Sequence, residues 1–180
     1  MNDKILPIKF LFQPRLDNGR VLIFHDTDKA NGYMSNWYMS PFKNDGGMEF
    51  CCVEQYLMYQ KALFFRDKEA MYAIMTTNDP AEMKRLGREV KGYTREWETV
   101  REGVLAVGLL YKFTQNPKLA KKLVKTGKKI LCEGTATDKV YANGLTRYDK
   151  NRFNPKKWPG QNILGYALMD LRDYLKTTMR

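Results

Sequence analysis

Histidine and cysteine, the side chains most often used to bind metals and to attack substrates, are scarce in this chain. Its 180 residues include 1 histidine and 3 cysteines. His25 falls in a β-rich run and is expected to be an ordinary strand residue, and the cysteines are Cys51, Cys52 and Cys132. A structural zinc site, a Ser-His-Asp triad and a disulfide framework are therefore not expected, because each needs several such residues at defined spacing.

Glycine-rich phosphate loops and long apolar runs are also lacking. Neither the P-loop nor the dinucleotide-binding glycine pattern occurs, which argues against nucleoside triphosphate hydrolysis and hydride transfer. The first residues, MNDKILPIKFLFQPRL, carry an early acid and two prolines, so we expect neither a signal peptide nor a membrane anchor. We predict a cytoplasmic protein with no metal, no cofactor and no membrane partner. The side chains left to perform any catalysis are carboxylates, lysines and arginines.

Acidic side chains are few relative to basic ones. The chain has 31 lysines and arginines against 20 aspartates and glutamates, a formal net charge of +11. An excess of this size can serve solubility alone, or it can mark an anionic partner such as nucleic acid or a phosphorylated small molecule. Charge alone leaves both interpretations open.

Helical periodicity dominates what remains, and it predicts a mainly α protein (α+β with a few short strands). We expect one compact multihelical domain over residues 1–180. The expected helices lie at 52–66, 79–87, 94–113, 116–127 and 162–177. Short strands are expected at 20–26 and 128–134, a small hairpin at 41–50, and a long polar loop at 135–161.

Three of these helices carry explicit end signals, and in the helix at 116–127 they are Asn116 as the cap, Pro117 as the first residue and Gly127 as the stop. Asp79 is the expected N-cap of its helix, with Glu82 completing a capping box and Gly87 as the stop. Thr94 is the expected cap of the long helix that follows.

The helix expected at 52–66 is apolar nearly all round, yet it carries Glu54 and Lys61 two turns apart. Isolated charges in apolar surroundings are costly unless they are paired or face a cleft. The two residues are therefore either a structural ion pair or part of a site.

Several separated stretches, taken in order, carry a family resemblance. They are SNWYMSPF (35–42), CVEQYLMYQKAL (52–63), RLGREV (85–90), WETVREGVL (97–105), KFTQNPKLAKKLVKTGKKILCEG (112–134), Asp138 and GQNILGYALMDLR (160–172). Their order and spacing resemble the YbiA-like, or NADAR, family over residues 21–175. The resemblance implies a single N-glycosidase domain that cuts the bond between ribose C1 and a nitrogen. One branch of the family acts on phosphoribosylated intermediates of riboflavin synthesis, and another removes ADP-ribose from guanine in DNA, undoing the modification made by a toxin.

The resemblance implies catalytic roles for Glu54, Lys61 and Asp138. A carboxylate near C1 stabilises the oxocarbenium-like transition state or activates water, and this is the role expected of Glu54. A buried lysine has a lowered pKa and can attack C1 as a neutral amine, forming an imine. Asp138 is either the second acid or a plain turn residue, and Trp97 either a stacking wall for a base or core packing.

The remaining candidates are expected to bind substrate. Arg88 and Arg101 either bind phosphates, which a guanidinium does in bidentate fashion, or are solvated charges on their helices. Asn36, Tyr141 and Asn162 complete the substrate-binding set.

The sequence also departs from the family pattern. The usual Glu-His pair is Glu54-Gln55, the usual Trp-Gly is Tyr141-Ala142, and the loop at 144–160 is longer and basic. Its cations that are candidates to contact a DNA backbone are Arg147, Arg152, Lys156 and Lys157.

Three functions are carried forward. The net charge and the basic loop favour ADP-ribosylated DNA as the partner. A phosphorylated riboside from riboflavin synthesis is the alternative substrate, and a non-catalytic ADP-ribose or nucleic-acid binding module is the alternative of another class. The sequence leaves open the strand state of any DNA and the oligomeric state.

Overall fold

The computed structural model describes residues 9–14 and 20–179. Residues 1–8, which carry half of the N-terminal stretch discussed above, lie outside the described part. The chain divides into two compact units. We call Asn36–Asn116 the helical unit, and the residues before and after it the mixed unit.

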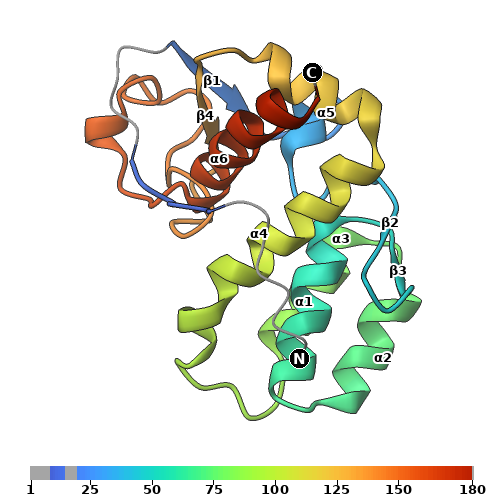
Figure 1. Cartoon of the computed structure of the whole chain (residues 1–180). Helices are drawn as coiled ribbons and strands as arrows, with labels where there is room; N and C mark the ends of the chain where they lie inside the picture. Colours follow the sequence, from blue (N-terminus) through green and yellow to red (C-terminus); the bar gives the residue numbers. More distant parts are fainter. Residues whose placement is uncertain (1–8, 15–19, 180) are drawn as a thin grey trace. The chain divides into compact units, whose positions relative to one another are not determined.

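The helical unit is built around its first helix. Its elements are β2 (Phe42–Lys43), β3 (Glu49–Phe50), α1 (Val53–Phe64), α2 (Lys68–Thr76), α3 (Pro80–Arg88) and α4 (Trp97–Gln115). Helix α1 packs against α2, α3 and α4, and β3 also contacts it (Figure 1). Neighbours on several sides explain why α1 is apolar nearly all round.

An aromatic cluster joins the hairpin to the helices of this unit. The rings of Phe42 and Phe50, from β2 and β3, lie 6.0 and 5.1 Å from that of Tyr56 on α1. Tyr111 on α4 lies 6.1 Å from the same ring. Such edge-to-face pairs stabilise a core beyond the area they bury. Strands β2 and β3 pair in antiparallel fashion, with Phe42 opposite Phe50, which confirms the predicted hairpin at 41–50.

The ends of α3 were predicted in part. The Asp79 carboxylate accepts from the Ala81 N–H at 2.9 Å, which confirms the cap. The capping box is wrong, because Glu82 pairs instead with Arg85 at 2.6 Å. The stop at Gly87 is also wrong, because α3 runs one residue further.

The packing of α3 against α1, rather than the end of a helix, explains the glycine at position 87. A Cβ there would overlap the Met58 sulfur and lie 2.8 Å from its Cγ, so glycine lets α3 approach α1 closely.

Two further boundaries differ from the sequence prediction. Helix α2 was not expected, although Asp67 caps it by accepting from the Ala70 N–H at 3.1 Å. Helix α4 begins at Trp97 rather than at Thr94, and Glu96 at its N-cap makes no side-chain capping bond.

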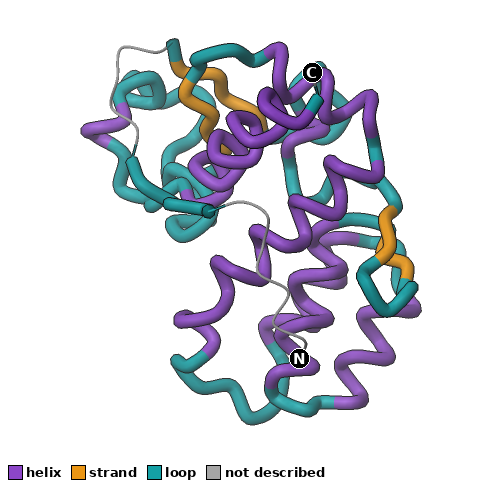
Figure 2. Tube along the Cα trace, viewed as in Figure 1, coloured by secondary structure: helices purple, strands orange, loops and turns teal. Residues whose placement is uncertain are grey.

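The mixed unit contains a small parallel sheet. Its elements are β1 (Val21–Phe24), η1 (Gly32–Met34), α5 (Pro117–Lys125), β4 (Ile130–Glu133), η2 (Pro155–Lys157) and α6 (Ile163–Thr178). Strands β1 and β4 pair in parallel, with Val21 opposite Ile130. Helix α6 packs on β4 and on α5. Figure 2 shows that strand makes up little of the described chain, which confirms the predicted mainly helical class.

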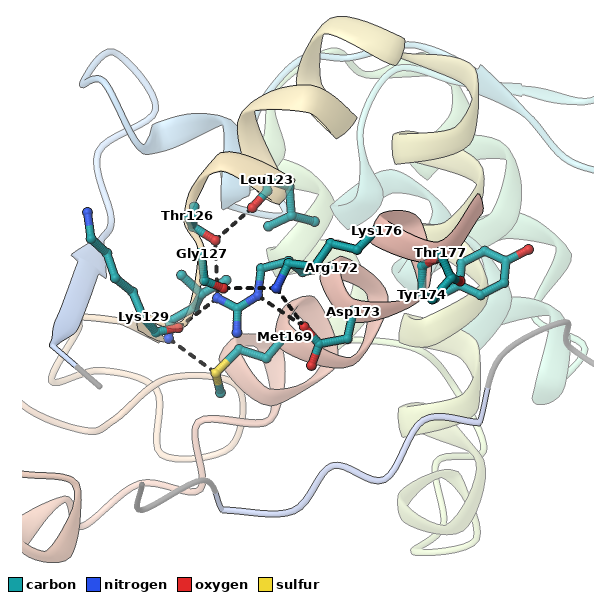
Figure 3. A network of polar contacts seen from close by, with 11 residues as sticks. Leu123, Thr126, Gly127, Lys129, Met169, Arg172, Asp173, Tyr174, Lys176 and Thr177 are labelled. Atoms are coloured by element: carbon teal, nitrogen blue, oxygen red, sulfur yellow. Dashed lines mark hydrogen bonds and ion pairs between the residues drawn. The ribbon is translucent and has the colours of Figure 1, made fainter. Parts of the chain in front are cut away.

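A buried arginine ties α6 to the turn between α5 and β4. The Arg172 guanidinium is 2% exposed and donates to Thr126 Oγ1 at 3.1 Å and to the Lys129 carbonyl at 2.7 Å (Figure 3). Lys176, one turn further along α6, donates to the Gly127 carbonyl at 3.1 Å. Gly127 has φ +68°, so it ends α5 in the left-handed region as expected.

None of the helices in the described part of the chain combines the length and the apolar character needed to cross a lipid bilayer.

Candidate active site

Glu54 lies in the first turn of α1, where it is 5% exposed. Its backbone N–H donates to the Asn36 carbonyl at 3.0 Å, which holds the segment before the hairpin against the start of the helix. The N-terminus of a helix favours a negative charge, because the unpaired N–H groups point toward it. The helical unit thus buries a carboxylate at a position that supports its charge.

Two buried polar atoms of the helical unit make no hydrogen bond within the described residues. Asn36 is 4% exposed, and its Oδ1 has no hydrogen-bond partner in the described part of the chain. The same holds for Nε of Arg101, on α4. A buried polar atom without a partner costs about 1–3 kcal/mol, so a bound polar molecule that satisfies it gains affinity. Both residues are predicted substrate-binding residues, and both have the unmet capacity that this role needs.

Lys61 is half-buried against α3 and the segment that follows α3. Its Nζ donates to the Gly87 carbonyl at 2.6 Å and lies 4.5 Å from the centroid of the Tyr93 ring. Burial lowers the pKa of Lys61. These contacts, rather than an ion pair with Glu54, stabilise the lysine on its apolar helix. Neither contact was predicted, because each depends on how α3 and the following turn pack on α1.

The Gln55 side chain makes structural hydrogen bonds that the sequence did not predict. Its Oε1 accepts from the Cys51 N–H at 2.9 Å, and its Nε2 donates to the carbonyls of Ile74 and Thr77 at 3.1 and 3.2 Å. The amide therefore links the start of α1 to the end of α2. The replacement of the family's histidine falls at a packing position in this chain.

Trp97 and Arg88 lie at element ends of the helical unit. Trp97 starts α4, is 5% exposed and packs edge-to-face on Phe64, with ring centroids 6.0 Å apart. Arg88 ends α3 and is exposed. Stacking on a base and phosphate binding stay predictions for these two residues.

Asp138 forms a tight turn in the mixed unit. Its Oδ1 accepts from the backbone N–H groups of Val140 and Tyr141 at 2.9 and 2.8 Å. The Tyr141 carbonyl in turn accepts from the Leu164 N–H at 3.1 Å, at the start of α6. The turn interpretation of Asp138 is thus present in the structure, and these bonds also fix its carboxylate, as a second acid requires.

Asn162 is fully buried in the same region and precedes α6 with φ +52°. Its Nδ2 donates to the Leu131 carbonyl at 2.9 Å, and its Oδ1 accepts from the Glu133 N–H at 3.2 Å. The amide therefore clamps the start of α6 to β4. Substrate binding by Asn162 stays a prediction beside this structural task.

The basic loop follows the Asp138 turn and is drawn in orange in Figure 1. Arg147 pairs with Asp26 at 2.7 Å, and Arg152 donates to the Asp149 carbonyl at 2.9 Å. Lys156 and Lys157 form most of η2 and are exposed. Asp26 offsets the charge of Arg147, whereas Arg152, Lys156 and Lys157 form no ion pair in the described part of the chain.

No group of three histidine, cysteine, aspartate or glutamate side chains gathers as a set of metal ligands in residues 9–14 and 20–179. Cys51 lies near Glu54 in the chain and is half-buried, and its Sγ lies 4.0 Å from that of Cys52. The hydrogen bond between the two thiols lowers the pKa of Cys51 to about 7.

Comparison with known proteins finds a family and several relatives that resemble this chain. The NADAR domain profile matches residues 23–176. The chain is 32% identical over 166 residues to the N-glycosidase R617 of Acanthamoeba polyphaga mimivirus, covering 88% of this chain and 98% of that protein. It is 31% identical over 156 residues to the N-glycosidase YbiA of Escherichia coli (strain K12), covering 86% of this chain and 88% of that protein.

The fold agrees with these relationships. The NMR structure of E. coli YbiA matches with a TM-score of 0.73 at 28% identity, covering 94% of this chain and 91% of that one. A riboflavin biosynthesis protein of Vibrio vulnificus (strain YJ016), VVA0006, is 27% identical over 86% of this chain, and the match spans 38% of that protein.

The family match and the relatives identify the chain as a hydrolase that acts on N-glycosyl bonds, and its fold agrees. The chain belongs to the NADAR family, as the ordered set of sequence stretches predicted.

Proposed function

We propose that this N-glycosidase removes ADP-ribose from guanine bases in DNA. The observation that carries the proposal is the gathering of Arg147, Arg152, Lys156 and Lys157 in one surface loop directly after the Asp138 turn. A small metabolite needs cations for only one or two phosphates. A chain with a net charge of +11 and a cationic loop next to a candidate site residue suits a polyanion.

The chemistry follows from the candidate residues. Ribose C1 becomes positively charged as its bond to the base nitrogen breaks, and the bonding electron pair leaves with the base. The Glu54 carboxylate stabilises that charge and accepts a proton from the attacking water, whose oxygen forms the new bond to C1. The proton that Glu54 takes from water passes to the departing nitrogen through solvent, so the products are the free sugar and the intact base and Glu54 is again a carboxylate.

A second substrate has an observation in its favour. The Vibrio relative is named for riboflavin biosynthesis, which points to phosphorylated aminopyrimidine ribosides. The same bond between C1 and nitrogen would break, and a phosphate would take the place of the polyanion.

A direct comparison of substrates tests the proposal. The protein is incubated with DNA ADP-ribosylated on guanine, with ADP-ribosyl-guanosine and with a phosphorylated aminopyrimidine riboside, and products are identified by mass spectrometry. Modified DNA is expected to have the highest kcat/KM, falling with salt by a slope of about −0.9 per neutralised phosphate on duplex or −0.7 on a single strand. Cleavage of the riboside without cleavage of DNA would establish the second substrate instead. Cleavage of neither would favour a binding module.

Loop variants connect the activity to the cations. Changing Arg147, Arg152, Lys156 and Lys157 to glutamine should raise KM for modified DNA and flatten the salt slope, while hydrolysis of ADP-ribosyl-guanosine stays nearly unchanged. The matched control changes four exposed lysines on and after α5, namely Lys118, Lys121, Lys125 and Lys128, which removes the same charge elsewhere. Equal effects of both variants would show that net charge, rather than the loop, attracts the substrate.

A further inference from the structure

The loop at residues 144–159 is closed at its base by its own backbone. The N–H groups of Gly160 and Gln161 donate to the carbonyls of Asn143 and Lys139, both at 2.9 Å. Asn162 donates likewise to the Ala142 carbonyl at 3.0 Å. The two ends of the loop are thus held side by side, as in the compact surface loops that often carry function.

Internal bonds give the same loop a defined surface. The Asp149 carboxylate accepts from the Asn151 N–H at 2.7 Å, and the Trp158 indole donates to the Arg152 carbonyl at 2.9 Å. The Asn154 N–H donates to the Asn151 carbonyl at 2.8 Å. Side chains on this loop are therefore presented from an ordered backbone.

Two aromatic rings stand out of this surface, each beside an arginine. Tyr148 is 81% exposed and Phe153 is 55% exposed. The guanidinium carbon of Arg147 lies 5.4 Å from the Tyr148 ring centroid, and that of Arg152 lies 4.4 Å from the Phe153 centroid. Each arginine covers only part of its ring, so ring surface remains open to solvent.

The charge around these rings has one dominant sign. The loop from 144 to 159 carries Arg147, Lys150, Arg152, Lys156 and Lys157 against the single acid Asp149. An apolar surface for a protein partner would not need five cations, and a site for phosphate alone would not need exposed rings. Cations that follow a backbone, together with rings on which bases stack, are the combination used by proteins that bind single-stranded nucleic acids.

We propose that loop 144–159 is a stacking platform for single-stranded DNA, with Tyr148 and Phe153 each receiving an unpaired base. In a duplex the faces of the bases are already stacked on one another, so exposed rings of this kind can be used only where the strand is open. That the strand is DNA rests on the proposed function. What the loop adds to the proposed function is that the bound DNA is single-stranded.

Fluorescence anisotropy tests the platform on the full chain. The probes are an unmodified mixed-sequence DNA single strand, the same sequence as a duplex, and the same sequence as an RNA single strand. The double variant Tyr148→Ala/Phe153→Ala is compared with Tyr72→Ala, a matched control on α2 whose side chain is 74% exposed. All three rings are exposed, so the variants are expected to fold, which thermal melting checks.

The expected result is a loss of single-strand affinity of about tenfold or more for each ring removed, with the salt slope unchanged. Tyr72→Ala should bind like the unaltered chain, and Tyr148→Trp/Phe153→Trp should retain binding. Lys156→Gln/Lys157→Gln should instead lower the slope by about 0.7 for each phosphate that the loop no longer neutralises.

Equal binding of single strand and duplex, a preference for RNA, or unchanged affinity in the double alanine variant would overturn the inference. Hydrolysis of ADP-ribosyl-guanosine is measured in parallel, because it does not need the platform. Single-strand binding that does not change when the rings are removed, with that hydrolysis intact, refutes the platform alone. Ring-dependent binding without any hydrolysis of ADP-ribosylated substrates refutes the proposed function alone.

Discussion

At the scale of single residues, the environment of Lys61 decides which chemistry it can perform. Its amine is half-buried between the Gly87 carbonyl and the Tyr93 ring, and burial lowers its pKa. A lowered pKa means that, at a given pH, more of the amine is neutral than in an exposed lysine. Only the neutral amine attacks a sugar carbon, so the position fits the predicted imine.

The imine can be trapped. Borohydride added during turnover should fix the sugar covalently on Lys61, and peptide mass spectrometry should locate the adduct. Lys61→Arg keeps a cation and a donor for the Gly87 carbonyl but cannot form an imine, so it should lose the adduct, and turnover should fall to what direct attack by water supports. Full turnover in Lys61→Arg or in Lys61→Met, or no adduct in the unaltered chain, would limit the lysine to an electrostatic or hydrogen-bonding task.

Cys51 should be the reactive thiol of the described chain. The hydrogen bond between the thiols of Cys51 and Cys52 lowers the pKa of Cys51 to about 7, whereas Cys132 is buried and its pKa is raised. Because the thiolate is the reacting species, the alkylation rate with iodoacetamide should reach half of its maximum near pH 7. Mass spectrometry of the folded protein should find Cys51 labelled first. A rate that rises only above about pH 8.5, as for an ordinary thiol, would contradict the assignment.

At the scale of elements, glycines inside two helices should respond in opposite ways to the same change. A Cβ at Gly87 would meet Met58, at 2.8 Å from its Cγ, so Gly87→Ala overpacks the contact between α3 and α1. The expected loss is about 1–3 kcal/mol in the free energy of unfolding. In α4, a Cβ at Gly103 meets no atom of the described residues within 4 Å. Gly103→Ala should stabilise by about 0.5–1 kcal/mol, because alanine favours the helix.

Denaturant unfolding of the two alanine variants measures both effects in one experiment. Similar changes in stability for Gly87→Ala and Gly103→Ala would show that helix propensity, rather than the approach of α3 to α1, sets the cost.

Local chemistry explains which elements could be predicted from the sequence. The ends of α5 and the cap of α3 were predictable, because Pro117, Gly127 and Asp79 act within one turn of the chain. Helix α2 was missed because it is short and buries only Ile74, which leaves little hydrophobic periodicity. The prediction of Gly87 as a helix stop was wrong because this glycine is needed for the close contact of α3 with Met58 on α1.

At the scale of the whole molecule, the sequence predicted the family and the fold class but not the contacts around the candidate site. Glu54 and Lys61 are candidates because isolated charges on an apolar helix are costly, and the family stretches point to the same positions. The acceptor for Lys61 and the two carbonyls held by Gln55 could not be found, because backbone atoms carry no sequence signature. The same applies to Asn162, whose amide serves β4.

The net charge of +11 acts over the whole chain, whereas the specific part of the proposal lies in one loop. The glutamine variants of that loop and of α5 separate the two, because they remove equal charge from different places. In the proposed mechanism both effects act on substrate binding, whereas Glu54 acts at the bond that is cleaved.

The central claim is that Glu54 drives cleavage of a ribose C1–N bond, and one measurement tests it most directly. Release of free ADP-ribose from DNA ADP-ribosylated on guanine is followed for the unaltered chain and for Glu54→Gln, together with their melting temperatures. Glutamine keeps the size of the side chain and removes its charge. We expect turnover to fall by about 10²- to 10³-fold or more while the melting temperature hardly changes. Near-normal release of ADP-ribose by Glu54→Gln would contradict the account.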